Sequence, residues 1–460
     1  MFRTLCIVFS SLALVVIVFA QSRDLAGLWQ GTLELPGAKL RLVFHVTRNA
    51  DGSYAAKADS PDQGATGLAV DEATLKDGNA RFVMMQLQAA FDGKLSADGG
   101  EIVGTFRQAG VTMPLTLKRV AQVEAPRRPQ LPQKPYPYEE EEVSYLNPRG
   151  KHTLAGTLTK PKGNGPFAAA LLITGSGAQD RDESLMGHKP FLVIADSLTR
   201  RGLAVLRVDD RSVGKSTGDF ATATSLDLAD DVTCGVRYLK SRKDIDAQRI
   251  GLIGHSEGGL IAPIVAARNP KDLAFLVLLA GPGTTGEEII YAQSALIAKA
   301  NGASEAIIHA ARERQQQLFA LLRKERDPVE VERQLRTTVG PEAASEAAQA
   351  QLRMVLSPWF RYFLTFDPKT ALRHVKCPVL ALNGEKDLQV PAKENLSEIR
   401  RALMAANNKS FVTKELPGLN HLFQTCKTGS PGEYAQIEET FSPAALKLMG
   451  DWIGRLTRQL

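Results

Sequence analysis

The feature that most constrains the fold of this chain is the pentapeptide Gly-His-Ser-Glu-Gly at residues 254–258, which stands between two apolar runs. Residues 250–253 have the length and composition of a buried strand, and residues 259–267 have the pattern of a packed helix. A strand that passes through G-x-S-x-G into a helix forces the serine onto a sharp turn, where its hydroxyl stands clear of the sheet. The pattern therefore predicts a sheet covered by helices, with Ser256 at its edge as a candidate nucleophile.

A second match to the same pattern, at residues 214–218, lacks this context. It follows an Asp-Asp-Arg triplet at residues 209–211 and continues into a polar stretch with no apolar helix behind it. It also resembles the end of a phosphate-binding loop, but the first glycine of such a loop would fall at Asp209. We therefore interpret Ser216 as a loop residue, and the triplet as a charge-assisted brace for the loops around the site.

Length and composition exclude several classes of protein. The 460 residues accommodate two or three domains with full cores, and 44% hydrophobic with 23% charged content is typical of globular proteins. The formal net charge of +6 is small for this length, so we expect no nucleic-acid partner. The cysteines lack metal-binding spacing, and without Cys6 the remaining Cys234, Cys377 and Cys426 can form at most one internal disulfide.

The first twenty residues differ from the rest of the chain. Arg3 is followed by an apolar run from Leu5 to Ala20, which ends in Val-Phe-Ala, as before a signal-peptide cleavage site. We expect residues 1–20 to be a signal peptide and the protein to be secreted or periplasmic. The alternative is an uncleaved N-terminal anchor. No later run is long and apolar enough to cross a bilayer, so no stable membrane span is expected after cleavage.

Two regions of different pattern follow. Residues 22–120 consist of short runs of strand formers between glycine turns, which predicts a small N-terminal antiparallel β domain. His45, in one of these runs, is interpreted as a packed strand residue because no second metal ligand lies at a useful spacing. Five prolines within residues 121–138 indicate a semi-extended linker.

Residues 139–460 alternate between apolar runs of strand length and helical stretches, which predicts an α/β domain with a mostly parallel sheet and helices on both faces. Nearly a hundred residues, mostly helix formers, separate the apolar runs at residues 275–280 and 379–382. An insertion at about residues 284–370 would lie at the carboxyl edge of the sheet, where ligands bind. We expect it to be a helical cap over the site; the alternative is a helical decoration beside the sheet.

The serine needs a base within hydrogen-bond reach, and the base needs a third group to orient it. On a turn of this kind the partners follow in the order serine, acid, histidine. Beyond the serine the chain has three histidines. His309 lies in the helical insertion, and His374 precedes a predicted strand, at the wrong edge of the sheet. His421 lies in a turn after the apolar run at residues 411–416.

Only His421 has an acid between it and the serine at the end of a predicted strand. Asp387 follows the run at residues 379–382, and Glu385 is the alternative. Such an acid fixes the imidazole tautomer and stabilises the imidazolium. The candidate triad is therefore Ser256, Asp387 and His421.

The reaction also needs hydrogen-bond donors for the oxyanion. One is expected to be the backbone N–H of Glu257, the residue after the serine. The other is expected from the Thr-Gly-Ser-Gly loop at residues 174–177, with Ser176, or failing that Gly177, as donor. The alternative is a plain glycine turn. The charged residues 180–182 are either residues of the site entrance or exposed loop charges.

Five features together resemble α/β-hydrolases, specifically secreted bacterial serine esterases with an extra N-terminal β domain. They are the loop at 174–177, the segment at 209–216, the pentapeptide, Asp387, and the Gly-Leu-Asn-His turn at 418–421. The resemblance covers residues 139–460. In this family the residue after Asp-Asp-Arg is usually glycine, whereas this chain has Ser212.

The resemblance implies an α/β-hydrolase fold and hydrolysis of small-molecule carboxylic esters with short to medium acyl groups. Ser256 would be the nucleophile of an acyl-enzyme, His421 the general base and then acid, and Asp387 the group that orients it. No cofactor and no metal are implied. The patterns make no prediction about the oligomeric state.

Two other functions stay open at this point. A serine aminopeptidase of the same fold would need acids in the cap to hold the ammonium group of its substrate, and Glu287, Glu288 or Glu305 could serve. The second alternative is a binding protein whose hydrolase unit is vestigial.

Overall fold

The computed structural model describes residues 24–35, 38–63, 65–108, 110–123, 127–325, 327–339 and 346–459. The expected signal peptide at residues 1–20 lies outside the described residues, as do residues 124–126 of the expected linker. The chain divides into two compact units, and the main boundary between them falls between Ala125 and Pro126. Each unit is described by itself.

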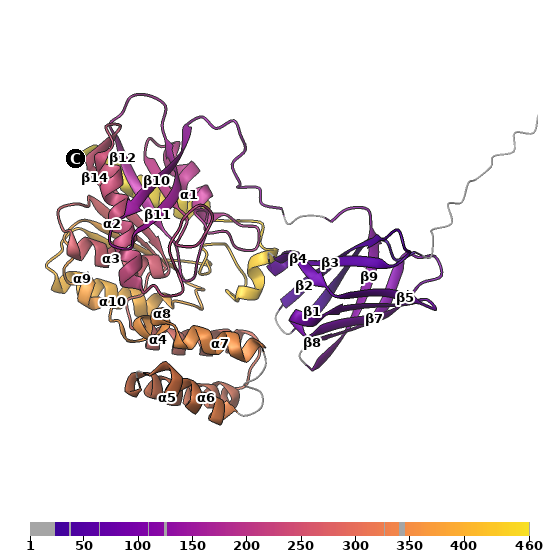
Figure 1. The fold of residues 1–460 in the computed structure, drawn as a ribbon. Coiled ribbons are helices and arrows are strands. Elements are labelled where there is room, and N and C mark those ends of the chain that lie inside the picture. Colours follow the sequence, from indigo (N-terminus) through magenta and orange to yellow (C-terminus); the bar gives the residue numbers. More distant parts are fainter. Residues whose placement is uncertain are drawn as a thin grey trace, which may run out of the picture. The chain divides into compact units, whose positions relative to one another are not determined.

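The first unit is an antiparallel sheet of nine strands (Figure 1). The strand order is β4-β3-β2-β1-β9-β8-β7-β6-β5, and the strand pairings described there are antiparallel. Since β3 also packs on β5 and β4 on β6, the sheet curls around one core, as in a small barrel. The strands are β1 (Gly27–Leu35), β2 (Ala38–Arg48), β3 (Tyr54–Ser60), β4 (Ala65–Val70), β5 (Glu72–Lys76), β6 (Asn79–Met84), β7 (Ala89–Leu95), β8 (Glu101–Gln108) and β9 (Val111–Val120).

The packing of β2 in this unit differs from the interpretation of His45 as a packed residue. Phe44, Phe82 and Phe91 are fully buried and stack on one another. Because side chains alternate across a strand, Phe44 points inward along β2 and His45 points outward. The His45 side chain is 41% exposed, and its Nε2 lies 2.7 Å from Asp59 Oδ2. The interpretation of His45 as a packed residue is therefore wrong, since it forms a surface pair with a carboxylate.

The second unit contains a sheet of eight strands in the order β10-β11-β13-β12-β14-β15-β16-β17. β11 is antiparallel to β10 and β13, and the other pairings are parallel. The carboxyl ends of the parallel strands therefore share one edge of the sheet. The strands are β10 (Glu139–Asn147), β11 (His152–Lys160), β12 (Phe167–Ile173), β13 (Ala204–Val208), β14 (Ile245–His255), β15 (Phe275–Leu279), β16 (Val379–Gly384) and β17 (Phe411–Leu416).

Helices cover both faces of this sheet, as predicted. Alternate residues of β12 belong to different cores: Ala169 and Leu171 pack with α2, α3 and α10, whereas Ala170 and Leu172 pack with α1 and α11. Burial on both faces explains why these strands read as continuous apolar runs. The helices are α1 (Pro190–Thr199), α2 (Ser225–Ser241), α3 (Glu257–Arg268), α10 (Ala392–Ala405) and α11 (Pro443–Gln459).

The later part of the proline-rich segment is attached to the second unit. The Arg128 guanidinium donates hydrogen bonds to the carbonyl oxygens of Met186, Ala435 and Ile437. The Gln130 side chain exchanges hydrogen bonds with the backbone at residues 440–441. Residues 127–138 therefore belong to this unit rather than to a free spacer.

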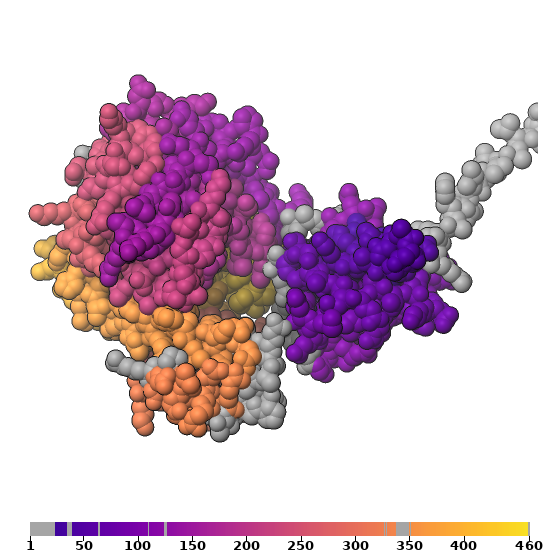
Figure 2. Space-filling view, viewed as in Figure 1, coloured from indigo at the N-terminus to yellow at the C-terminus, as the bar shows by residue number. Residues whose placement is uncertain are grey.

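The predicted insertion between β15 and β16 forms a helical cap. Its helices have a small core of their own, which includes Tyr291, Phe319, Val355 and Phe360. In the space-filling view, the cap and the segment that follows it form one continuous surface (Figure 2). The helices are α4 (Gly286–Ala300), α5 (Glu305–Lys324), α6 (Pro328–Val339), α7 (Glu346–Leu356), α8 (Pro358–Thr365) and α9 (Lys369–Leu372).

Within the described part of the chain, every helix is too short or too polar to cross a membrane. Three cysteines fall in this part, and Cys234, Cys377 and Cys426 are all free thiols.

Candidate active site

Ser256 lies on a strained turn between β14 and α3. Its φ of 52° and ψ of −118° fall outside the regions that residues with a side chain normally occupy. Such a conformation costs on the order of 1–3 kcal/mol and persists only where the surroundings enforce it. Here the Ser256 N–H donates to the Leu279 carbonyl at 2.8 Å, and the Ser256 carbonyl accepts from the N–H of Gly259 at 2.9 Å. The turn is therefore tied to β15 on one side and to α3 on the other.

The glycines of the motif allow this turn to pack against the sheet. A Cβ at Gly254 would lie 2.0 Å from the Gly258 carbonyl oxygen, and a Cβ at Gly258 would lie 2.1 Å from the Ile173 carbonyl oxygen. A Cβ at Gly259 would lie 2.6 Å from the Cα of Gly281. Each of these contacts is with backbone and cannot be relieved by a side-chain movement. Glycine at all three positions is therefore a steric requirement of the fold.

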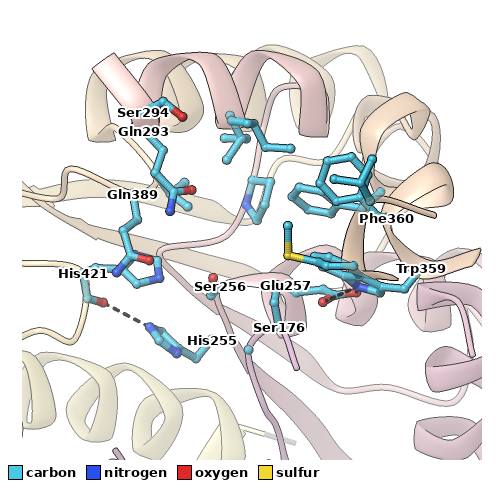
Figure 3. Close-up of a pocket in the computed structure, with 18 of the residues that line it drawn as sticks. Ser176, His255, Ser256, Glu257, Gln293, Ser294, Trp359, Phe360, Gln389 and His421 are labelled. Carbon is cyan, nitrogen blue, oxygen red and sulfur yellow. Dashed lines mark hydrogen bonds between the residues drawn. The ribbon is translucent and has the colours of Figure 1, made fainter. Parts of the chain in front are cut away.

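Asp387 and His421 form a buried pair in the loops after β16 and β17. His421 Nδ1 donates to Asp387 Oδ2 at 2.8 Å. Asp387 Oδ1 accepts the backbone N–H groups of Gln389 and Val390, both at 2.8 Å, so the carboxylate is held in one orientation. His421 and Ser256 line the same cavity, and Figure 3 shows Ser256 between His421 and Glu257.

The other residues considered for the triad lie elsewhere. Glu385 Oε2 accepts the N–H of Gly418 at 2.8 Å, and so supports the turn that leads into His421. His309 is exposed on α5, and His374 is exposed in the turn after α9. None of the three lines the cavity of the serine.

His255 braces the loops around the candidate triad. Its Nε2 lies 3.0 Å from the His421 carbonyl oxygen, and its Nδ1 lies 2.9 Å from Glu183 Oε1, which also accepts the N–H of Gly175 at 2.7 Å. Burial disfavours the charged imidazole, but the Glu183 carboxylate outweighs it and raises the pKa of His255. Because a carbonyl and a carboxylate both accept, both ring nitrogens donate, which describes an imidazolium.

The loop after β12 passes directly over the serine. A Cβ at Gly175 would lie 3.3 Å from the Cβ of Ser256. The Gly175 N–H is already donated to Glu183, and Ser176 is the next residue that lines the cavity. Gly177 lies outside the cavity lining, with nothing within 4 Å of its Cβ position. Of the two predicted donors in this loop, Ser176 is the one at the cavity.

The Glu257 side chain joins the serine turn to the cap. Glu257 is 1% exposed, and its carboxylate accepts hydrogen bonds from the Ser225 hydroxyl at 2.6 Å and from Trp359 Nε1 at 2.8 and 2.9 Å. The Ser176 side chain also donates to it. Burial raises the pKa of Glu257 despite these donors. The prediction concerned only the backbone N–H of Glu257, so this contact between α3 and α8 was missed.

The Asp-Asp-Arg triplet braces the loops through three different partners. Asp209 pairs with Arg181 at 2.7 Å, and Arg211 pairs with Asp231 at 2.5 Å. Asp210 accepts from the Thr174 hydroxyl at 3.0 Å, and burial raises the pKa of Asp210 to about 8. The triplet holds the loops as predicted, although no pair forms within it.

The charges at residues 180–182 are neither exposed nor part of the cavity. The Arg181 side chain is 16% exposed because Asp209 and Glu142 both pair with it. Asp182 pairs with Lys189 and Arg207. The expectation of exposed loop charges is therefore wrong for Arg181 and Asp182, which partners from other segments cover, while Asp180 accepts N–H groups of its own loop.

The loop at residues 212–218 is ordered by two serines. Ser212 has a φ of 63°, in the left-handed region that favours glycine. Its hydroxyl donates to the Gly218 carbonyl at 2.8 Å. Ser216 is buried, and its hydroxyl donates to the Asp209 carbonyl and accepts the N–H of Ala155. Ser216 is thus a structural loop residue.

The cavity has a volume of about 490 Å³ and lies between the sheet edge and the cap. Its lining includes Ser256 and His421, aromatic residues of the cap, and uncharged polar residues from α4, α5 and the loop after β16. Among the described residues, no group of three His, Cys, Asp or Glu side chains is arranged to hold a metal ion.

A model of the alpha/beta hydrolase family matches residues 171–437, more than half of the chain, and this range includes the serine turn and both partners. The chain belongs to the alpha/beta hydrolase family. This alpha/beta hydrolase is 29% identical to esterase EstD of Thermotoga maritima over 272 residues, which make up 58% of each chain. It therefore spans little more than half of the length of that relative.

Solved structures of other hydrolases match more weakly. An esterase of Pyrococcus furiosus, Pf2001, has 16% identity and a TM-score of 0.43, with 74% of this chain and 99% of that chain covered. A proline iminopeptidase of Mycobacterium smegmatis has 17% identity and a TM-score of 0.43, with 69% and 98% covered.

Sequence reasoning missed three side chains of this alpha/beta hydrolase that support the site. Glu183 and Trp359 stand in no motif, and their contacts come from loops and helices far apart in the chain. His255 stands in the motif itself, beside the serine. Its place beside the candidate nucleophile is a signal that it needs a carboxylate partner. The sequence, however, offers no means to choose Glu183 among 50 acidic residues.

Proposed function

We propose that this hydrolase cleaves small-molecule carboxylic esters through an acyl-enzyme on Ser256. The observation that carries the proposal is the buried hydrogen bond from His421 to Asp387, in the lining of the cavity into which the strained serine turn opens. A serine with a positioned and oriented base is the constellation of nucleophilic acyl transfer.

The proposed mechanism follows from this arrangement. Since Nδ1 of His421 donates to Asp387, its Nε2 carries the lone pair that takes the proton of the Ser256 hydroxyl. The serine oxygen attacks the ester carbonyl, and the oxyanion accepts backbone N–H groups of Glu257 and Ser176. His421 then protonates the leaving alcohol, and water repeats the sequence to release the acid. Neither a metal nor a cofactor takes part in these steps.

The contacts of the cap acids favour an ester over a peptide substrate. Glu287 is paired with Arg323, Glu288 caps the N-terminus of α4, and Glu305 lies 3.0 Å from Lys299. None of the three lines the cavity. The carboxylates in the described lining are Glu183 and Glu257, and both already accept several hydrogen bonds from the protein. An aminopeptidase would need a carboxylate free to bind ammonium.

The proposal includes export from the cytoplasm. It is supported by the charged and apolar pattern of residues 1–20, which is that of a cleaved signal peptide. After cleavage of the signal peptide, the esterase would act on substrates outside the cytoplasm.

The experiment compares nitrophenyl acyl esters with aminoacyl nitroanilides. We expect the esters to be turned over, and Ser256→Ala to lose at least about 10⁴-fold in kcat, as removal of a nucleophile does. The serine of the second G-x-S-x-G match provides the control: Ser216→Ala should retain activity. Turnover of the nitroanilides alone would rule out the ester assignment.

A further inference from the structure

The two sides of the cavity differ in chemistry. In Figure 3, Gln389, Gln293 and Ser294 lie on the same side of Ser256 as His421. Trp359 and Phe360 lie on the opposite side, beside Glu257 and Ser176. All of these residues line one cavity, so a bound ester must place a different group on each side.

The proposed reaction determines on which side of the cavity the alcohol part and the acyl part of the ester lie. If Ser256 and His421 act as proposed, the imidazole gives its proton to the leaving oxygen, so the alcohol part of the ester must lie on the side of His421. The oxyanion points to the backbone N–H groups of Glu257 and Ser176. The acyl group takes the remaining space, away from His421.

The alcohol side carries three neutral polar side chains, Gln389, Gln293 and Ser294, that can both donate and accept. Gln389 is adjacent to the triad, because its backbone N–H bonds Asp387 Oδ1. Its amide nitrogen donates to the Tyr434 hydroxyl at 2.9 Å, which leaves its amide oxygen available as an acceptor. Gln315 Nε2 donates to the Ser294 hydroxyl at 2.8 Å.

Gln293 is the polar side chain that a ligand would satisfy. Its amide is half-buried at the cavity, and within the described part of the chain it has no hydrogen-bond partner. A ligand that covers this amide takes it out of water, and a desolvated polar group without a partner is costly, so the amide favours a ligand with hydroxyl groups. The charged groups of the lining nearest to His421 are His255 and Glu183, which are buried and already paired with each other.

The acyl side excludes charge. Trp359 and Phe360 present aromatic surface there. The carboxylate of Glu257 is already occupied by donors from Ser225 and Trp359, and it would repel an anionic acyl group. An apolar acyl group is the part of an ester that fits this side.

We propose that this hydrolase selects esters of an apolar acyl group with a neutral alcohol that carries several hydroxyl groups, and that Gln293 is a specificity-determining residue for the alcohol. The proposal rests on the proposed ester hydrolysis. Sugars and glycerol both supply such an alcohol, and the test separates them.

The test measures kcat/KM for butyrate esters that differ only in the alcohol. Glycerol monobutyrate is compared with propyl butyrate, and glucose monobutyrate with hexyl butyrate. We expect at least one hydroxylated ester to be preferred by about tenfold, the value of roughly one well-made hydrogen bond. The pair with the larger preference identifies glycerol or a sugar as the alcohol.

A variant tests the residue itself. Gln293→Met keeps the length of the side chain and removes the amide, so it should lower kcat/KM for the hydroxylated ester by about tenfold and leave the alkyl ester within about twofold. Gln317→Met is the matched control, since Gln317 is exposed on α5 outside the cavity lining, and it should change neither value.

Three results would count against the proposal in different ways. If wild type cleaves each alkyl ester as well as its hydroxylated partner, the alcohol assignment is overturned, while ester hydrolysis stands. If Gln293→Met slows both esters equally, the residue supports the cap rather than the alcohol, and the specificity role is overturned. If no butyrate ester is cleaved at all, the proposed function fails first.

Discussion

The protein holds the Asp387 and His421 side chains in fixed orientations. Asp387 accepts two backbone N–H groups besides His421, so its carboxylate cannot turn away from the imidazole. His421 is also held through its own carbonyl oxygen, which contacts His255. His421 is therefore fixed at both its ring and its backbone, which is the preorganisation that the proposed acyl transfer requires.

The role of the acid can be tested with an isosteric change. Asp387→Asn keeps the shape but can present an N–H to His421, which favours the wrong imidazole tautomer, and we expect kcat to fall by about 10³- to 10⁴-fold. Steady-state kinetics with a nitrophenyl ester measures this. The nearby acid Glu385 serves as control: Glu385→Gln should stay within about tenfold of wild type, since it keeps an oxygen for the Gly418 N–H. Equal losses in both variants would contradict the assignment.

The pair of Glu183 and His255 predicts a dependence of stability on pH. The pKa of His255 is raised above its ordinary value of 6.5. The stabilisation that this shift supplies is therefore complete below pH 6.5 and is lost as the pH rises through the raised pKa. Glu183→Gln removes the main cause of the raised pKa, so its destabilisation should be largest in mildly acidic solution and shrink in alkaline solution. Thermal unfolding across this range measures the difference, and a constant or growing difference would contradict the prediction.

At the scale of elements, the apolar runs and the serine motif predicted the α/β unit. Both signals lie within a few consecutive residues, so they can be recognised without knowing the tertiary contacts. Strands buried on both faces must be apolar throughout, and the turn needs glycines at fixed positions. The order of serine, acid and histidine then limited the candidates for the base. Contacts such as Arg181 with Asp209 could not be predicted, because burial of a charge depends on which distant loop covers it.

The contact between α3 and α8 predicts that the cap supports the site. Trp359→Phe keeps an aromatic ring on the cavity wall but removes the N–H that Glu257 accepts, leaving a buried carboxylate with fewer donors. We expect a loss of about 1.5–3 kcal/mol in stability, as for a hydrogen bond to a charged group, with a rise in KM for esters. Tyr362→Phe on the same helix is the control, since its hydroxyl has no hydrogen-bond partner in the described part of the chain. If both variants behave alike, Glu257 does not depend on the cap.

At the scale of the whole molecule, the site belongs to one unit. The serine turn, Asp387, His421, the loop after β12 and the cap all come from the unit that follows Ala125, and that unit has its own cores on both faces of its sheet. The nine-stranded unit has a separate core. Composition predicted this division, since strand formers between glycine turns give way to alternating strands and helices.

This division predicts the effect of a deletion. Removal of residues 22–123 should leave kcat/KM for a nitrophenyl ester within about threefold of wild type, because each core is made within one unit. Kinetics on the purified variant measures this, with circular dichroism to establish that it is folded. A folded variant without activity would show that the first unit contributes to the site.

The central claim is that His421 activates Ser256 for attack on a carbonyl, and labelling with a fluorophosphonate tests it most directly. Peptide mass spectrometry of the labelled protein should find one adduct, on the peptide that carries Ser256. Ser256→Ala should abolish this adduct, His421→Ala should slow it by at least about a hundredfold, and Ser216→Ala should leave it unchanged. Equal labelling of wild type and Ser256→Ala, or an adduct on Ser216, would contradict the claim.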